Sequence, residues 1–335
     1  MRAAVTQGAG EPLVLERLPD PTPGPGQLLI RVESCGICGS DLHIADAVEM
    51  PGRVLGHEFA GTIVGMDRDA GDFADGQRVA VFPLFGCGTC PACLNGRPSR
   101  CATRQLIGGG LDGGYAEFVA INSRQAFPLP EAVDAHAGAF VEPLAVALNA
   151  WRLTPTEDGE PVLVLGGGPV GQAIAVWAKH FGASDVIVSD PVAHRRQLAE
   201  RAGASATIDP NAGDVAESFA ELTGVRPRVV IECVGVPGMI QHAIELAESD
   251  GHVTVVGMCL GPDEFVPRLA MSKGLSARFV LLYEESDYDL TIRTLARGAL
   301  DYRALITDVI SLDQLPERFE ALKHPTTECK VIIEP

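Results

Sequence analysis

The spacing of apolar positions changes along this chain of 335 residues. Up to about Pro130, short runs rich in β-branched residues alternate with turns rich in glycine and proline. Such runs are typical of strands. The clearest of them span residues 28–32, 59–64, 78–82 and 115–119. We therefore expect an irregular, antiparallel, β-rich unit with few long helices in this part of the chain.

From about Glu142 onward, short apolar runs alternate with segments of helix length. The runs predict six strands, at residues 162–165, 186–189, 206–208, 229–231, 253–256 and 278–281. Helical spacing of apolar residues predicts helices between them, at residues 170–181, 194–202, 213–222 and 239–248. This alternation indicates βαβ units, so the fold class is α/β with a doubly wound parallel sheet.

The two patterns predict two domains. We expect the β-rich domain to span residues 1–145 and the α/β domain residues 146–281. A helical segment at 289–298 and a β-like run at 330–333 follow. We expect residues 282–335 to return to the first domain and complete it. No repeat of 20–50 residues is present, which excludes solenoids and propellers.

Composition and charge exclude several functional classes. The 44 Asp and Glu residues outnumber the 26 Lys and Arg residues, giving a net charge of −18. Such a chain disfavours binding to nucleic acid or to an anionic membrane. No apolar run is long enough to span a membrane, and residues 1–10 lack the pattern of a secretory signal. We therefore expect a cytoplasmic protein that acts on a small molecule.

Four of the nine cysteines fall within 15 residues and predict a zinc site. Disulfides are not expected in a reducing compartment. Zinc prefers four soft ligands in a tetrahedral shell, and four thiolates would fill it without leaving a position for substrate. We therefore expect a structural zinc ion in this loop, with reduced cysteines and no metal as the alternative. The four residues are Cys87, Cys90, Cys93 and Cys101.

A second group of possible ligands comes from two separate segments. Cys35 and Cys38 precede His43, and His57 is followed by Glu58. One thiolate, one imidazole and one carboxylate form an incomplete shell, which a catalytic zinc ion needs in order to bind substrate. Taken alone, the Cys-x-x-Cys spacing is also compatible with a redox pair.

A glycine-rich turn predicts a dinucleotide site. Gly166, Gly168 and Gly171 have the G-x-G-x-x-G spacing and lie between a predicted strand and a predicted helix. They permit a sharp turn, close approach of a pyrophosphate and close packing of the helix. Pro169 and Val170 open that helix, whose free N–H groups face the phosphate.

An acidic residue supports this interpretation and favours NAD. Asp190 ends the next predicted strand, 19 residues after Gly171. A carboxylate there accepts hydrogen bonds from the ribose hydroxyls and repels a 2′-phosphate. Arg195 and Arg196 follow closely and could weaken that discrimination, or they could form a solvated helix face.

Together these motifs resemble the zinc-dependent medium-chain alcohol dehydrogenase family over essentially the whole chain. The resemblance includes the polyol and threonine dehydrogenase branch. It implies a GroES-like catalytic domain and a Rossmann NAD-binding domain. It also implies two zinc ions per subunit, NAD, and a homodimer or homotetramer. The motifs that carry it are Gly-Ile-Cys-Gly-Ser-Asp-x-His (36–43), Gly-His-Glu-Phe-x-Gly (56–61), the four-cysteine loop, Val-Glu-Pro-Leu-Ala (141–145) and the glycine-rich turn (166–171).

The resemblance implies roles for individual residues. Cys38 and His57 match ligands of the catalytic zinc, whereas Cys35 matches a position that the family does not use for metal. Glu142, Glu58 or water would complete the shell. The remaining roles are these: Asp41 orients the ligating imidazole, Ser40 takes the hydroxyl proton, His43 receives it through the cofactor ribose, and Arg195 joins the cofactor-binding residues.

We therefore interpret the chain as an NAD-dependent zinc alcohol dehydrogenase that interconverts a secondary alcohol or polyol and its ketone. Asn149 departs from the histidine that polyol and threonine dehydrogenases usually have there. The apolar segment 44–50 favours a less hydroxylated substrate, unless its residues pack in the core. Two alternatives stay open: an NADPH-linked zinc aldehyde or ketone reductase, and a catalytically silent protein that binds zinc and NAD.

Overall fold

The computed structural model describes residues 1–324 and 327–335, which divide into two compact units. The first consists of Met1–Glu142, Tyr283–Arg297 and Ile306–Pro335, and the second of Pro143–Leu282 and Gly298–Leu305. These bounds differ from the expected 145/146 and 281/282 by one to three residues. Residues 298–305, which we expect in the first domain, lie with the second unit, where Leu300 and Leu305 are buried.

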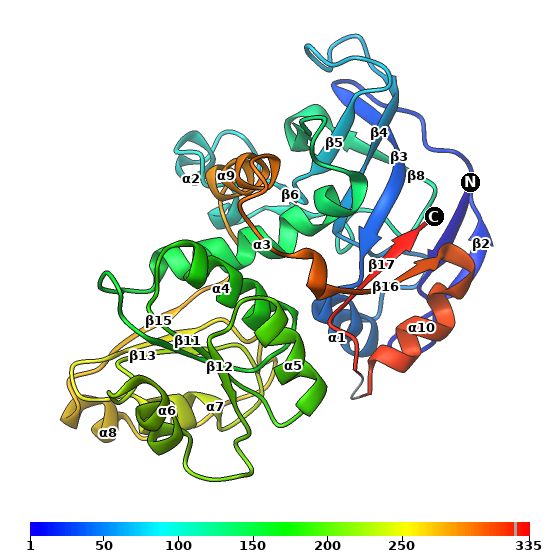
Figure 1. Ribbon diagram of the computed structural model, residues 1–335. Coiled ribbons are helices and arrows are strands. Elements are labelled where there is room, and N and C mark those ends of the chain that lie inside the picture. Colours follow the sequence, from blue (N-terminus) through cyan, green and yellow to red (C-terminus); the bar gives the residue numbers. More distant parts are fainter. Residues whose placement is uncertain (325–326) are drawn as a thin grey trace. The chain divides into compact units, whose positions relative to one another are not determined.

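A sheet of seven strands, counted over the described residues, forms the framework of the first unit (Figure 1). The order is β16-β17-β3-β4-β5-β9, and β8 also pairs with β3. Strands from both ends of the chain therefore join one sheet, as the sequence predicts. The strands are β3 (Gln27–Gly36), β4 (Glu58–Met66), β5 (Arg78–Val81), β8 (Phe118–Asn122), β9 (Ala126–Pro128), β16 (Ile306–Ser311) and β17 (Lys330–Glu334).

The predicted strand at 115–119 is displaced in the structure. Strand β8 begins at Phe118, because the preceding residues pair with the amino terminus instead. The Ala4 N–H donates to the Tyr115 carbonyl, and Ala116 forms a bridge with Ala3. Two short strand pairs complete the unit: β1 (Arg2–Val5) with β2 (Val14–Arg17), and β6 (Leu84–Phe85) with β7 (Gln105–Leu106).

The helices of the first unit were largely not predicted from the sequence. Helix α3 (Ala135–Leu153) has no polar face, since most of its residues are buried, and amphipathic spacing cannot reveal such a helix. Helix α9 (Glu285–Ala296) corresponds to the predicted segment at 289–298. No described helix is both long and apolar enough to cross a bilayer. The other helices are α1 (Gly39–Ala47), α2 (Pro91–Leu94), α3 (Ala135–Leu153, which continues into the second unit) and α10 (Leu315–Leu322), with short 3₁₀ turns η1 (Pro98–Arg100), η2 (Ser123–Gln125) and η4 (Leu312–Gln314).

The second unit contains the predicted parallel sheet with helices on both faces (Figure 1). The strand order is β12-β11-β10-β13-β14-β15, and every neighbouring pair is parallel. This is the Rossmann order, which confirms the predicted fold class. The elements are β10 (Val162–Leu165), α4 (Pro169–His180), β11 (Val186–Ser189), α5 (Ala193–Arg201), β12 (Ala206–Ile208), α6 (Val215–Thr223), β13 (Val229–Glu232), α7 (Met239–Leu246), β14 (His252–Val255), α8 (Pro267–Ser272), β15 (Ser276–Phe279) and η3 (Arg303–Leu305).

Candidate metal and dinucleotide sites

The first candidate site lies where strands β3 and β4 end beside each other. Their antiparallel register places Gly36 opposite Glu58. Cys38 is the N-cap residue of helix α1, just beyond the end of β3, and His57 directly precedes β4. The ligand atoms of Cys38, His57 and Glu58 all lie within 4.8 Å of one another. The structure thus brings together the thiol, the imidazole and the carboxylate that the sequence singles out.

Asp41 lies directly behind His57 and is fully buried. His57 Nδ1 lies 3.0 Å from Asp41 Oδ1, and the Cys38 backbone N–H donates to Asp41 Oδ2 at 3.1 Å. Burial raises the pKa of Asp41, but the charge of His57 and these hydrogen bonds outweigh it, so the net pKa is lowered. Asp41 therefore caps helix α1 and contacts the imidazole at the same time.

The electrostatics of this group favour a cation. Burial lowers the pKa of His57, but the charges of Asp41 and Cys38 outweigh it and raise the pKa well above its ordinary value. A proton on His57 is one way to balance the negative charge, and a metal ion at Nε2 is another. Soft sulfur, imidazole nitrogen and carboxylate oxygen are the donors that zinc takes. The residues therefore fit a zinc ion.

Lys330, at the start of β17, is a site residue that the sequence analysis missed. Its side chain is 1% exposed, and its Nζ lies 2.7 and 2.6 Å from the two carboxylate oxygens of Glu58. It also donates to the Ile37 carbonyl at 3.1 Å. Burial lowers the pKa of Lys330, but the charge of Glu58 outweighs it and the net pKa is raised. A lysine directly before the apolar run Val331–Ile333 was the available signal.

Glu142 lies near this group without joining it. Its ligand atoms are outside the compact set of Cys38, His57 and Glu58, and its side chain is 5% exposed. Burial raises the pKa of Glu142 to about 7, with the charge of His57 opposing this rise and that of Glu58 adding to it. Burial and the charge of Glu142 also raise the pKa of Tyr283 well above its usual value. Glu142 therefore interacts electrostatically with the site.

Ser40 and His43 both lie on helix α1. The Ser40 hydroxyl donates to Cys38 Sγ at 3.2 Å, which places it beside a candidate ligand. His43 is exposed and makes no hydrogen bond or ion pair within residues 1–324 and 327–335. The structure therefore brings Ser40, but not His43, to the ligand group.

The apolar segment 44–50 turns out to pack largely into the protein. Ala45 is buried, and Ile44 and Met50 pack against the core of the first unit. Val48 is 43% exposed. The core interpretation is therefore the correct one for these three residues. The argument for a less hydroxylated substrate loses its basis.

The four-cysteine loop forms a second ligand group in the first unit. All four sulfur atoms lie within 4.8 Å of one another, and Cys90 Sγ lies 3.5 Å from Cys93 Sγ. Hydrogen bonds from the Thr89 backbone, the Thr89 hydroxyl and the Cys90 backbone lower the pKa of Cys87 to about 5. Within the same loop, burial raises the pKa of Cys93 to about 12, so these surroundings favour the thiolate at Cys87 and the thiol at Cys93. A tetrahedral S4 set fits zinc.

The dinucleotide turn has the expected context in the second unit. Strand β10 ends at Leu165, and helix α4 begins at Pro169 with Gly168 as its N-cap. A Cβ atom on Gly171 would lie 1.9 Å from the Gly166 carbonyl oxygen, so only glycine fits there. The first turn of α4 contains no acidic residue. No acidic side chain of the helix's own first turn therefore opposes an anion at its N–H groups.

Asp190 faces this turn from the end of β11. Its Oδ2 accepts a hydrogen bond from the Gly167 N–H at 2.8 Å, and its side chain is 3% exposed. Arg195 Nη1 lies 3.8 Å from the same oxygen. Arg196 is engaged elsewhere, because it donates to the Asp190 carbonyl and pairs with Asp209. Asp190 and Arg195 thus flank the turn.

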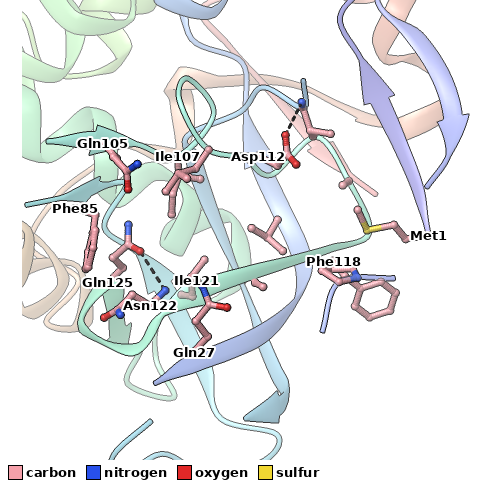
Figure 2. A pocket seen from close by; sticks show the side chains of 17 residues that line it. Met1, Gln27, Phe85, Gln105, Ile107, Asp112, Phe118, Ile121, Asn122 and Gln125 are labelled. Carbon is pink, nitrogen blue, oxygen red and sulfur yellow. Dashed lines mark hydrogen bonds between the residues drawn. The ribbon is translucent and has the colours of Figure 1, made fainter. Parts of the chain in front are cut away.

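A separate pocket of about 300 Å³ lies in the first unit (Figure 2). Apolar side chains such as Phe85, Ile107 and Phe118 line it, together with amides such as Asn122 and Gln125. None of the candidate site residues is among those that line it. The chemistry described above is therefore not located in this pocket.

Two family models together match most of the chain. Residues 24–131 match the model of the alcohol dehydrogenase GroES-like domain, and residues 169–297 match that of the zinc-binding dehydrogenases. The sorbitol dehydrogenase of Bacillus subtilis (strain 168) is 32% identical over 347 residues, covering 100% of this chain and 97% of that protein.

Two solved structures agree closely with this fold. A zinc-binding dehydrogenase from Sinorhizobium meliloti 1021 bound to NADP has a TM-score of 0.92 and 35% identity, with coverage of 100% and 99%. An alcohol dehydrogenase from Escherichia coli CFT073 complexed with NADH has a TM-score of 0.90 and 29% identity, with the same coverage.

Proposed function

Because the chain belongs to the zinc-dependent medium-chain alcohol dehydrogenase family, we propose that it oxidises a secondary alcohol or polyol to the ketone and passes the hydride to NAD. The observation that carries this proposal is the compact group of Cys38, His57 and Glu58, in a chain that also has a dinucleotide turn. Sorbitol dehydrogenase among the relatives favours a polyol.

Cys38 Sγ and His57 Nε2 are the proposed ligands of a catalytic zinc ion. His57 Nδ1 is already engaged by Asp41, which leaves Nε2 for the metal. Zinc, when bound, polarises the alcohol oxygen and lowers the pKa of the hydroxyl. Glu58, which pairs with Lys330, or Glu142, which interacts electrostatically with His57, would complete the shell, directly or through water.

We assign the hydroxyl proton of the substrate to Ser40. The Ser40 hydroxyl lies 3.2 Å from Cys38 Sγ, so its Oγ borders the metal position and can accept a proton there. His43 is exposed on the same helix, where its imidazole can pass a proton to solvent. Asp41 orients the imidazole of His57 and takes no part in the proton transfer.

The preference for NAD rests on Asp190. Its buried carboxylate beside the glycine-rich turn disfavours a 2′-phosphate, and Arg195 is held near that carboxylate. The relatives bind either form, since one structure contains NADP and the other NADH. We therefore base the proposed preference of this chain for NAD over NADP on the charge of Asp190.

Steady-state kinetics with sorbitol, other polyols and simple secondary alcohols test this proposal. We expect kcat/KM to be at least about tenfold higher with NAD than with NADP. Asp190→Ala should erase most of that difference, whereas Asp209→Ala, a neighbouring carboxylate outside the turn, should not. Higher efficiency with NADPH and a ketone would identify the reductase instead. No turnover by the zinc-loaded protein on any of these substrates would identify a silent binding protein.

We also propose that the chain forms a homo-oligomer through strand β15. This strand is the edge of the parallel sheet, and all four of its residues are exposed. Phe279 and the nearby Leu281 are 64% and 66% exposed, which is unusual for large apolar side chains. A second copy related by a two-fold axis covers both. Light scattering should show a dimer or tetramer that Phe279→Glu dissociates, and a wild-type monomer would contradict it.

A further inference from the structure

A buried tyrosine completes the hydrogen bonding of Asp41. The Tyr115 hydroxyl donates to Asp41 Oδ2 at 2.7 Å, and both side chains are 0% exposed. Asp41 therefore has three donors, namely the Tyr115 hydroxyl, the Cys38 backbone N–H and His57 Nδ1. Two of these occupy Oδ2, so Oδ1 is left for the imidazole alone.

The fold fixes the position of Tyr115 closely. Its backbone N–H donates to the Leu55 carbonyl, two residues before His57, and its carbonyl accepts from Ala4. Its ring lies against Gly56, where the backbone has φ +92° and an added Cβ would lie 2.5 Å from the ring. The ring also meets Phe319 edge-on, with centroids 6.2 Å apart. Tyr115 therefore has little freedom to reorient.

The chemistry of the phenol suits this position. Burial and the charge of Asp41 raise the pKa of Tyr115 well above its ordinary value, so the phenol stays protonated and donates. A carboxylate that accepts a fixed hydrogen bond on one oxygen presents its other oxygen in a fixed direction. The direction of Oδ1 in turn sets the orientation of the imidazole plane and of Nε2.

We propose that Tyr115 is a positioning residue for the catalytic metal. Through Asp41 it fixes the orientation of the His57 imidazole that binds the metal, and it touches neither metal nor substrate. This inference rests on the proposed zinc site. Tyr115 is a residue that none of the sequence motifs singles out. The inference predicts that removing its hydroxyl group alters a metal site that it reaches only through Asp41 and His57.

The test compares zinc binding by the full-length protein and its Tyr115→Phe variant. A chromophoric chelator withdraws zinc, and the absorbance of its zinc complex follows the release over time. The phase of release that is present in wild type but absent from Cys38→Ala is assigned to the catalytic site. We expect Tyr115→Phe to weaken zinc binding in that phase about tenfold. In the cobalt-substituted protein we expect its visible absorption band to shift. Tyr288→Phe is the matched control, because Tyr288 is also fully buried but donates to the Val81 carbonyl.

The outcomes separate this inference from the proposed function. Zinc affinity within twofold of wild type and an unchanged cobalt spectrum in Tyr115→Phe would overturn the role of Tyr115 and leave the proposed function intact. The absence of any release phase that depends on Cys38 in wild-type protein would overturn both.

A second pair of variants decides the question if Tyr115→Phe folds poorly. Tyr115→Phe removes a hydrogen-bond donor from the buried Asp41 carboxylate. Asp41→Asn has no carboxylate at this position, so adding Tyr115→Phe to it should be tolerated. Equal zinc affinities of Asp41→Asn and the double variant support action through Asp41. A further tenfold loss in the double variant would contradict it.

Discussion

The two cysteine-containing groups of the first unit differ in how the chain builds them. The four-cysteine loop draws all its ligands from 15 consecutive residues, and its sulfur atoms range from exposed to buried. The Cys38 group joins the ends of two strands and is backed by Asp41, Tyr115 and Lys330. One group is local and self-sufficient in ligands. The other depends on residues from the whole length of the chain.

This difference indicates which of the two groups could hold a catalytic metal ion. Four thiolates from a short loop satisfy zinc completely and leave no position for a substrate. The Cys38 group offers fewer direct ligands but surrounds them with buried charges that hold each one in place. We therefore expect loss of the first group to affect stability, and loss of the second to affect turnover.

The largest expected effect is that of Cys38→Ala on turnover. Loss of this thiolate should lower kcat/KM at least about a thousandfold, because several kcal/mol of charge stabilisation are lost. Elemental analysis should find one zinc ion fewer per chain, and the melting temperature should change little. Activity within tenfold of wild type would show that the group is not the catalytic centre.

The next largest effect is expected for Lys330→Met. Glu58 would then be a buried carboxylate without its cation, which should lower the free energy of unfolding by about 3–5 kcal/mol. Urea denaturation measures this change. Lys330→Met combined with Glu58→Gln should regain more than half of the loss. If the double variant were no more stable than the single one, the pairing would not be the cause.

Cys90→Ala should lower stability and leave turnover nearly unchanged, the reverse of what we expect for Cys38→Ala. Removing one ligand opens a metal cross-link across about 15 residues, and a cross-link of that span contributes about 3 kcal/mol to stability. The melting temperature should therefore fall, while kcat of the folded fraction stays within about threefold. A fall in kcat as large as that of Cys38→Ala would erase the distinction between the two groups.

The smallest expected effect is that of Thr89→Val on the pH at which the loop loses its metal. The pKa of Cys87, about 5, is low partly because the Thr89 hydroxyl donates to its sulfur. Protons compete with the metal for this sulfur, and they compete less well when the pKa of the thiol is low. Without this hydrogen bond the pKa rises, so metal release should begin at a higher pH.

Zinc content measured between pH 4 and 7 checks this prediction, with Thr62→Val as a control because Thr62 donates to Glu33, away from the cysteines. A shift to lower pH in Thr89→Val would show that the sign is wrong.

The elements that the sequence predicted well are those whose apolar pattern matches their burial. Strand β10 and its parallel neighbours are buried on both faces and are read directly as short apolar runs. Helix α3 was missed because it is buried nearly all round, and strand β8 was displaced because Tyr115 and Ala116 pair with the amino terminus. In both cases tertiary contacts, rather than local pattern, determine the element.

The candidate sites divide in the same way. Spacing alone identified the four loop cysteines and the glycine-rich turn, because short motifs keep their residues together through any fold. The resemblance to a known family singled out Cys38 and His57, which lie on separate segments. Spacing could not reveal Lys330, whose partner Glu58 is far away in sequence, or Tyr115, whose partner is Asp41. Nor could it separate the residues of segment 44–50 that face the core from those that face solvent.

The amino-acid sequence by itself determined the two-domain α/β architecture and the donor types of both metal groups. These follow from apolar periodicity and from the chemistry of side chains at short separations. Only the tertiary structure decided which buried charges surround each donor. Strand register brings residues from opposite ends of the chain within hydrogen-bond distance, and no local pattern encodes that register.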